Sequence, residues 1–372
     1  MDAEDNRFSM AQALVLMSYW YESPKNPKDI WHWACIALSA ARAIEFGFNI
    51  EGDMDALAPG KHFKNPEQER QWRRILWSAY CRYTITALGM RQPIPQGNAE
   101  LHIPVLTSAD FCLSPLPRDL LAVIGDEYAF LGDAGYQEQM AVLCIKYTEL
   151  CTHLAHILSC QYSTTSLITD PTAMSPTITL AASTSTVDIV SKYDEGLVSW
   201  LLNLPACVHY SAGSLSDGRD QVLFLLRAFL KMLYLTTTIT LHRPFAQQQS
   251  FSQDVNLFRY SSHLKVEQAT TEIMEIVYCL HNRGLTRFLP LTAVTSIFTT
   301  AMFNIQQTVS ENAMTRIKSG SCLHTCTLVM KSLADVHIAA DDGLSMLATT
   351  VQRTKFRWCH QYLCEIGSII AG

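Results

Sequence analysis

The strongest constraint on this fold is a stretch in which apolar residues cover nearly every side of a predicted helix. Residues 219–241 contain these apolar residues: Val222, Leu223, Leu225, Leu226, Phe229, Leu230, Met232, Leu233 and Leu235. A helix that is apolar on all sides has to be surrounded by other elements. Elsewhere, apolar residues also recur at helical spacing, and the alternation typical of strands is hard to find. The sequence therefore predicts an all-α fold with residues 219–241 as a central helix.

The composition indicates a well-buried globular protein that is poorly suited to hold nucleic acid by itself. Of the 372 residues, 48% are hydrophobic and 17% are charged, and the formal net charge is −6. Binding to phosphates depends on clustered Lys and Arg, which this balance does not favour. The densest basic run is Arg70, Arg73 and Arg74, and it is interleaved with Trp72 and Trp77. We interpret these arginines as the rim of a buried helix.

Helix-end signals occur at several points along the chain. Asn65 precedes Pro66, an arrangement that places a capping side chain before a proline at the first helical position. Gly47 is predicted to end the preceding helix in a left-handed conformation. Further helical blocks are predicted at about residues 136–161 and 187–204.

The segment between these two blocks has a different composition. Of the 28 residues in 161–188, thirteen are Ser or Thr, and Pro171 and Pro176 lie among them. Such a segment cannot support a core and is typical of a flexible linker or surface loop. We therefore expect one large multi-helix domain with a Ser/Thr-rich internal loop: a first helical half over residues 1–160, the loop over 161–188, and a second helical half over 189–372.

The longest uncharged run, residues 288–310, is long enough to suggest a membrane span. It contains Pro290 and Asn304, and six Ser or Thr residues lie before Ser310. This polar content is high for a membrane-spanning segment. We predict a buried helix here and no membrane association.

The cysteines and histidines form no closed set of metal ligands. No Cys-x2-Cys pair occurs in the 372 residues. The nearest approaches are two cysteine pairs and one group on a single predicted helix: Cys322 with Cys326, Cys359 with Cys364, and Cys151 with His153, His156 and Cys160. None of them gives the tetrahedron that a structural zinc site needs. We predict no metal site, and we read the twelve cysteines as free thiols in a reducing compartment.

Patterns typical of catalysis are also missing. The sequence has no Gly-x-Gly-x-x-Gly, no phosphate loop, no His-Glu-x-x-His and no Gly-x-Ser-x-Gly. Asp341-Asp342 lacks the downstream third acid of a metal-dependent helical synthase. We predict no catalytic residue, no resident cofactor and no enzymatic activity.

Several elements, taken in order, resemble one known family. They are Gln12-Ala13-Leu14-Val15-Leu16, Trp31-His32-Trp33, the segment 37–49, Glu69 to Trp77, Gly89-Met90-Arg91-Gln92-Pro93, Trp200-x3-Leu204-Pro205, and His242-Arg243-Pro244-Phe245. In this order and spacing they resemble the fungal-specific transcription factor domain, the helical regulatory region of six-cysteine zinc cluster regulators. The form at residues 89–93 is most similar to the cutinase transcription factor branch. The resemblance covers residues 11–250.

This resemblance implies a nuclear regulator of transcription, in a setting such as control of a specialised metabolic gene cluster. The family's zinc belongs to an N-terminal cluster, which these 372 residues do not contain. We therefore expect contact with DNA only indirectly or through a region ahead of Met1, in a natural truncation or a gene whose start lies upstream. A core that lacks helices it was built to receive would expose apolar surface and attract a partner. Homo- or hetero-dimers with related regulators are expected.

Alternative functions stay open at the level of sequence. The chain could be a decoy that pairs with full-length regulators and silences them, or an enzyme or carrier that borrowed the scaffold. Two arginines could contact a small-molecule effector. Arg91 lies in the turn after a long apolar helix, where an arginine could instead satisfy carbonyl groups. Arg243 ends a predicted helix, where it could instead interact with the last carbonyls.

Overall fold

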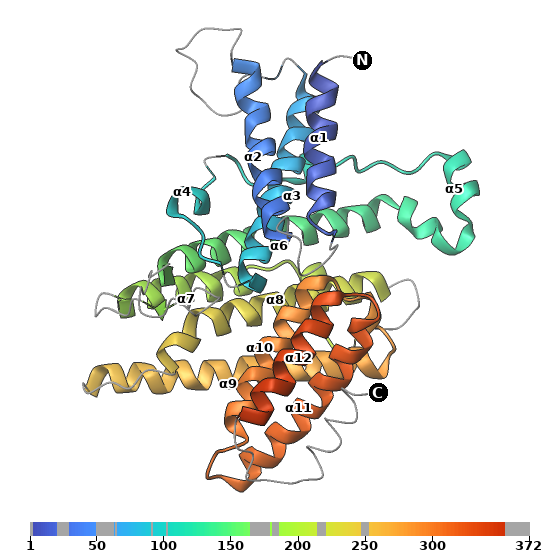
Figure 1. The fold of residues 1–372 in the computed structure, drawn as a ribbon. Coiled ribbons are helices and arrows are strands. Elements are labelled where there is room, and N and C mark those ends of the chain that lie inside the picture. The colour runs from blue at the N-terminus through green and yellow to red at the C-terminus, as the bar shows by residue number, and fades with distance from the viewer. Residues whose placement is uncertain are drawn as a thin grey trace. The chain divides into compact units, whose positions relative to one another are not determined.

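The structure, a computed structural model, consists almost entirely of helices (Figure 1). It describes residues 3–20, 30–49, 63, 65–90, 92–101, 103–163, 179–180, 186–213, 221–246 and 253–353. Within these residues the only strands are a two-residue antiparallel pair, β1 (Tyr162–Ser163) and β2 (Thr179–Leu180). The all-α prediction is confirmed.

The helices belong to two compact units, which we describe separately. Unit 1 comprises Met1–Thr184 with Val198–Val208, and unit 2 comprises Ser185–Leu197 with His209–Gly372. The predicted boundaries at 161 and 188 stay predictions, because residues 164–178 and 181–185 lie outside the described part of the chain.

Unit 1 is built around the long helix α3. Its elements are α1 (Ala3–Met17), α2 (Ile30–Asn49), α3 (Pro66–Met90), α4 (Gln96–Ala99), η1 (Ser108–Asp110), α5 (Arg118–Ile124), η2 (Asp126–Gly132), α6 (Ala134–Gln161) and η3 (Ala206–Val208). Helices α1, α2 and α3 pack side by side, and α3 also packs on α6 (Figure 1). Every residue from 79 to 87 is buried, so this part of α3 is enclosed on all sides. Burying each large apolar side chain contributes about 1.5–3 kcal/mol.

The start of α3 follows the signal read from the sequence. The Asn65 side-chain oxygen accepts a hydrogen bond from the backbone N–H of Glu67 at 2.9 Å, and the helix begins at Pro66. The prediction for Gly47 is wrong, because α2 continues through this residue to Asn49. A glycine inside a helix costs about 1 kcal/mol, which the surrounding helical hydrogen bonds can offset. The described glycines with positive φ are Gly125 and Gly284.

Unit 2 is built around helix α8. Its elements are α7 (Thr186–Leu202), α8 (Gln221–Ala246), α9 (Gln253–Asn282), η5 (Thr286–Phe288), α10 (Leu291–Gln307), α11 (Ala313–Ala334) and α12 (Ile338–Arg353), with the last residues of α7 assigned to unit 1. Helices α9 and α10 pack on α8, and α11 and α12 pack on α10. Apart from Lys231 and Thr238, every residue from 228 to 242 is buried. The prediction of a central helix is confirmed.

Threonines are accommodated in the interior of α8 because their hydroxyls are bonded. The Thr236 hydroxyl donates to the Met232 carbonyl at 2.8 Å and lies 2.7 Å from the Ser296 hydroxyl of α10. A buried hydroxyl with partners avoids the cost of desolvation without compensation. Among the described helices, α8 alone is long and apolar enough to cross a membrane, and 67% of its most apolar window is buried inside the protein.

Most of the run 288–310 forms α10 (Leu291–Gln307), with Pro290 at its N-cap. Val294, Ile297 and Ala301 recur at helical spacing, and all are buried. The prediction of a buried helix in this run is confirmed.

Replacing Trp77 with Ala should lower the free energy of unfolding by about 3–5 kcal/mol. Trp77 is 2% exposed, and its indole N–H donates to the Pro104 carbonyl at 3.0 Å. The change therefore leaves both a cavity and an unpaired carbonyl. Denaturant unfolding of the purified chain measures the loss. The matched control is Ser78→Ala at the exposed neighbouring position, which should change stability by no more than about 0.5 kcal/mol. Equal stability of the two variants would contradict the burial.

Candidate functional site

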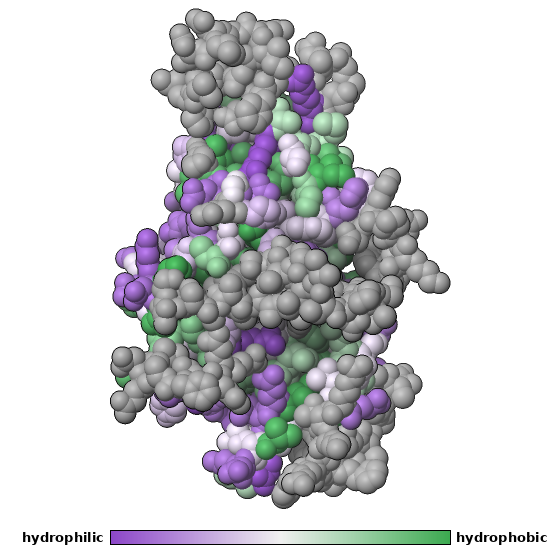
Figure 2. Space-filling view, turned by 60° about the vertical axis from the view of Figure 1, so that its left-hand side comes forward, coloured by the Kyte–Doolittle hydropathy of each residue, from purple (hydrophilic) through white to green (hydrophobic). Residues whose placement is uncertain are grey.

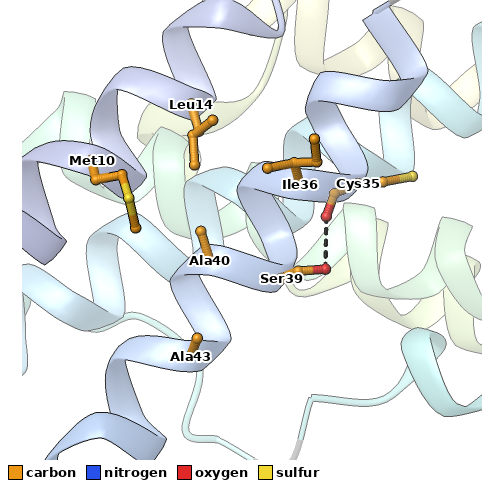
Figure 3. A pocket seen from close by; sticks show the side chains of 7 residues that line it. All are labelled: Met10, Leu14, Cys35, Ile36, Ser39, Ala40 and Ala43. Atoms are coloured by element: carbon orange, nitrogen blue, oxygen red, sulfur yellow. Dashed lines mark hydrogen bonds between the residues drawn. The ribbon is translucent and has the colours of Figure 1, made fainter. Parts of the chain in front are cut away.

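An apolar groove of about 610 Å³ lies between α1 and α2 of unit 1 (Figure 3). It is lined by Met10 and Leu14 from α1, and by Cys35, Ile36, Ser39, Ala40 and Ala43 from α2. The one hydroxyl in this set already forms a hydrogen bond, since Ser39 donates to the Cys35 carbonyl at 2.9 Å. The groove therefore presents hydrocarbon and sulfur to an incoming group.

The groove follows from how the two helices use their faces. On α1, Phe8 and Ala11 are buried, and Met10 on another face is 50% exposed. On α2, residues 34, 37, 38 and 41 are buried, and the adjoining face carries the small side chains of Ser39, Ala40 and Ala43. Small side chains beside long ones leave room for the ridge of another helix.

Large apolar residues are also exposed near the end of α1. Leu16 is 71% exposed, and Tyr19 and Trp20 are also largely exposed. The space-filling view shows hydrophobic side chains at the molecular surface among hydrophilic ones (Figure 2). Exposed apolar surface of this kind is typical of protein–protein contact.

The residues after α1 are held in place by a buried arginine of α3. The Arg82 Nε–H donates to the Ser18 hydroxyl at 3.0 Å, and a terminal nitrogen donates to the Ser18 carbonyl. The guanidinium carbon lies 3.9 Å from the centre of the Tyr19 ring. Burial lowers the pKa of Arg82, and Tyr19 and Tyr147 oppose this effect. Sequence reasoning missed Arg82, although a lone arginine inside the apolar stretch of α3 was a readable signal.

The arginines at the start of α3 are occupied by acidic groups. Arg70 pairs with Glu67 at 2.6 Å, and Arg73 pairs with the fully buried Asp110 at 2.6 Å. Arg74 donates to the Asp110 carbonyl. The interpretation of this run as the rim of a buried helix is confirmed. Asp110 was not identified from the sequence.

The His-Arg-Pro-Phe element lies in the last turns of α8, within unit 2. The His242 ring is 2% exposed, and its Nε2 lies 2.9 Å from the Asp194 carboxylate of α7. Its Nδ1 lies 3.2 Å from the Ser262 hydroxyl of α9, and Lys265 donates to the other Asp194 oxygen. A carboxylate only accepts, so Nε2 carries a proton; in the neutral ring Nδ1 then accepts from Ser262.

This order of Ser, His and Asp is that of a nucleophilic triad, but the burial argues for a structural role. Ser262 is 1% exposed and the ring beside it is equally enclosed, so a substrate has no access to the hydroxyl. The contacts instead join α7, α8 and α9. Burial raises the pKa of Asp194, but hydrogen bonds from His242 and Lys265 outweigh burial, and the net pKa is lowered.

Of the two arginines predicted to contact an effector, the structure describes only Arg243. Arg91 lies outside the described residues. Arg243 is partly buried in the last turn of α8. An effector contact at either residue stays a prediction.

The described residues contain no group of three or more Cys, His, Asp or Glu side chains that could hold a metal ion. Cys151 is buried and Cys160 is exposed, although both lie on α6. Cys359 and Cys364 fall outside the described residues.

Asp194→Asn should lower the free energy of unfolding by about 1.5–3 kcal/mol at neutral pH, the range for hydrogen bonds to charged groups. Because the folded pKa of Asp194 is lowered, its contribution is complete above the unfolded pKa near 3.8 and disappears as the pH falls through the folded value. The stability difference between wild type and variant should therefore shrink below about pH 4. Urea unfolding at pH 7 and pH 3 measures it. Glu195→Gln at the exposed next position is the control, and a difference that persists unchanged at pH 3 would contradict the assignment.

Comparison with known proteins finds similarity to one family. Residues 2–171 match the family described as "Fungal specific transcription factor domain". The chain is 31% identical over 366 residues to cutinase transcription factor 1 beta of Fusarium vanettenii, covering 95% of this chain and 40% of that protein. It is 28% identical over 329 residues to transcription factor cpaR of Aspergillus oryzae, covering 84% of this chain and 52% of that protein. Cutinase transcription factor 1 alpha of Fusarium vanettenii is 22% identical over 334 residues, covering 90% and 32% respectively. No solved structure matches.

Proposed function

Since the chain carries a fungal specific transcription factor domain over residues 2–171, we propose that it is the helical regulatory part of a transcription regulator that works through protein contacts. The chain spans between 32% and 52% of the length of the relatives compared above. In this proposal, a region outside these 372 residues or a partner protein recognises the DNA bases.

The observation that carries the proposal is the apolar groove between α1 and α2. A surface of hydrocarbon and small side chains suits an apolar helix and offers nothing to a phosphate backbone. The net charge of −6 also disfavours binding to phosphates, and Arg70 and Arg73 are already paired with carboxylates. We assign no enzymatic activity to the chain and place it in the nucleus, in keeping with the names of its relatives.

The proposed occupant of the groove is a second copy of this chain. One face carries both protruding side chains, Met10 and Leu14, and a floor of small ones, Ser39, Ala40 and Ala43. In a two-fold pairing the protruding residues of each copy can enter the floor of the other, so one surface serves both copies. A related regulator with the same helices is the alternative occupant, which would make a hetero-dimer.

Ala43→Arg should weaken self-association, because a long charged side chain would fill the groove floor. Ala43 is exposed, so the fold should tolerate the change. Analytical ultracentrifugation of the purified chain should show a dimer for wild type and a monomer for the variant. Gln12→Arg, exposed on α1 but not lining the groove, adds the same charge as a control and should remain dimeric. A monomeric wild type would refute self-association and leave a related regulator as the partner to test.

A reporter experiment tests the effect on transcription. Residues 1–372 fused to a foreign DNA-binding domain should change expression of the matching reporter, and Ala43→Arg should reduce that change where Gln12→Arg does not. The unfused chain, co-expressed with a full-length relative on a cutinase promoter, tests the decoy alternative. A fall in expression would support a decoy, and a rise would exclude it. No change in either arrangement would refute the proposed function.

A further inference from the structure

A second, more enclosed cleft lies within unit 2, where α9, α10 and α11 meet. Its volume is about 200 Å³. That equals the liquid volume of roughly seven water molecules, so it suits a molecule of about seven to ten non-hydrogen atoms. Drug-sized ligands occupy about 300 Å³ or more, which makes this a site for something smaller.

Opposite charges line the cleft from two different helices. Glu267 lies on α9 and Lys318 on α11, and both side chains are exposed. The Lys318 ammonium donates to the Thr271 hydroxyl at 3.3 Å, one helical turn along α9 from Glu267. Within the described part of the chain, the two charges nevertheless form no ion pair with each other. Each therefore keeps hydrogen-bonding capacity toward a ligand.

The buried residues that line the cleft are polar and uncharged. Asn304 of α10 is buried, and its amide nitrogen donates to the Thr300 carbonyl at 2.9 Å. Among the described contacts no donor reaches the Asn304 side-chain oxygen, so it can accept a hydrogen bond. Ser319 of α11 is also buried and also lines the cleft. Burial raises the pKa of the lining thiol Cys322, and the nearby Lys318 ammonium opposes that rise, which places this charge at the cleft.

The N-terminus of α11 does not supply the group that binds a ligand. Met314 and Thr315 line the same cleft, but their backbone N–H groups both donate to the Asn312 side chain, at 2.9 and 3.3 Å. The positive end of this helix is thus already capped. Recognition of an anion in the cleft falls to Lys318.

We propose that this cleft binds a small zwitterion, an α-amino acid, as an effector of the chain. Its carboxylate would pair with Lys318 and its ammonium with Glu267, and its side chain would face Asn304 and Ser319. One ligand then satisfies both unpaired charges at once, whereas a simple anion or cation satisfies one and leaves the other. The inference concerns unit 2 and does not depend on the groove of unit 1 or on any effect on transcription.

The test uses the full purified chain and the twenty standard L-amino acids, one at a time, in calorimetric titration. At least one should bind. For that amino acid, the N-acetyl derivative lacks the ammonium and the amide lacks the carboxylate, so both should bind at least about tenfold more weakly. Glu267→Gln and Lys318→Met should each weaken binding of the amino acid by a similar factor. Glu275→Gln and Lys192→Met, exposed positions outside the cleft, are matched controls that should bind as wild type.

Three outcomes would overturn the proposal. The first is that none of the twenty amino acids binds to wild type. The second is that binding of an amino acid is unaffected by both cleft variants. The third is that succinate binds as tightly as the amino acid and depends on Lys318 alone, which would make this an anion site. Thermal unfolding without ligand should be the same for all four variants, since each changed side chain is exposed. These measurements have no transcriptional readout, so their failure leaves the proposed function standing.

Discussion

Burial of one helix on nearly every side, α3 in unit 1 and α8 in unit 2, is the constraint on which the other elements depend. Neither helix can keep its apolar side chains from water alone, so each needs neighbours on all sides. Helices α1, α2 and α6 pack on α3, and helices α9 and α10 pack on α8. Polar residues inside these two helices are tolerated where they have a partner, as Arg82 has Ser18 and Thr236 has Met232.

The two surfaces singled out above differ in the chemistry they present, and this difference assigns them different tasks. The groove between α1 and α2 is apolar, with its single hydroxyl bonded within its own helix. Such a surface gains free energy by excluding water, and it offers a charged group no counter-charge or hydrogen bond. The cleft of unit 2 is smaller, and its lining includes a carboxylate, an ammonium and an amide. Such a site discriminates by charge and hydrogen bonding rather than by area.

Buried charge clusters in both units are structural on the geometry observed. Asp110 pairs with Arg73 near the start of α3, and Asp194 on α7 pairs with His242 on α8 and Lys265 on α9. Breaking such a buried pair leaves an uncompensated charge, which costs more than the pair contributes when intact. The Ser262–His242–Asp194 arrangement shows why geometry alone does not make a catalytic site, since a nucleophile must also be reached by its substrate.

The sequence by itself determined the all-α class, the central position of α8 and the start of α3 at Pro66, and its short motifs predicted the family that residues 2–171 match. These features depend on local periodicity, capping chemistry and short motifs, which are readable within one or two helical turns. Only the tertiary structure decided which acids pair with Arg73 and His242, where the groove lies, and that Glu267 and Lys318 share a cleft. Those partners are 37, 48 and 51 residues apart in the chain. Spacing along a helix carries no information about contacts between helices, because those depend on how whole faces pack.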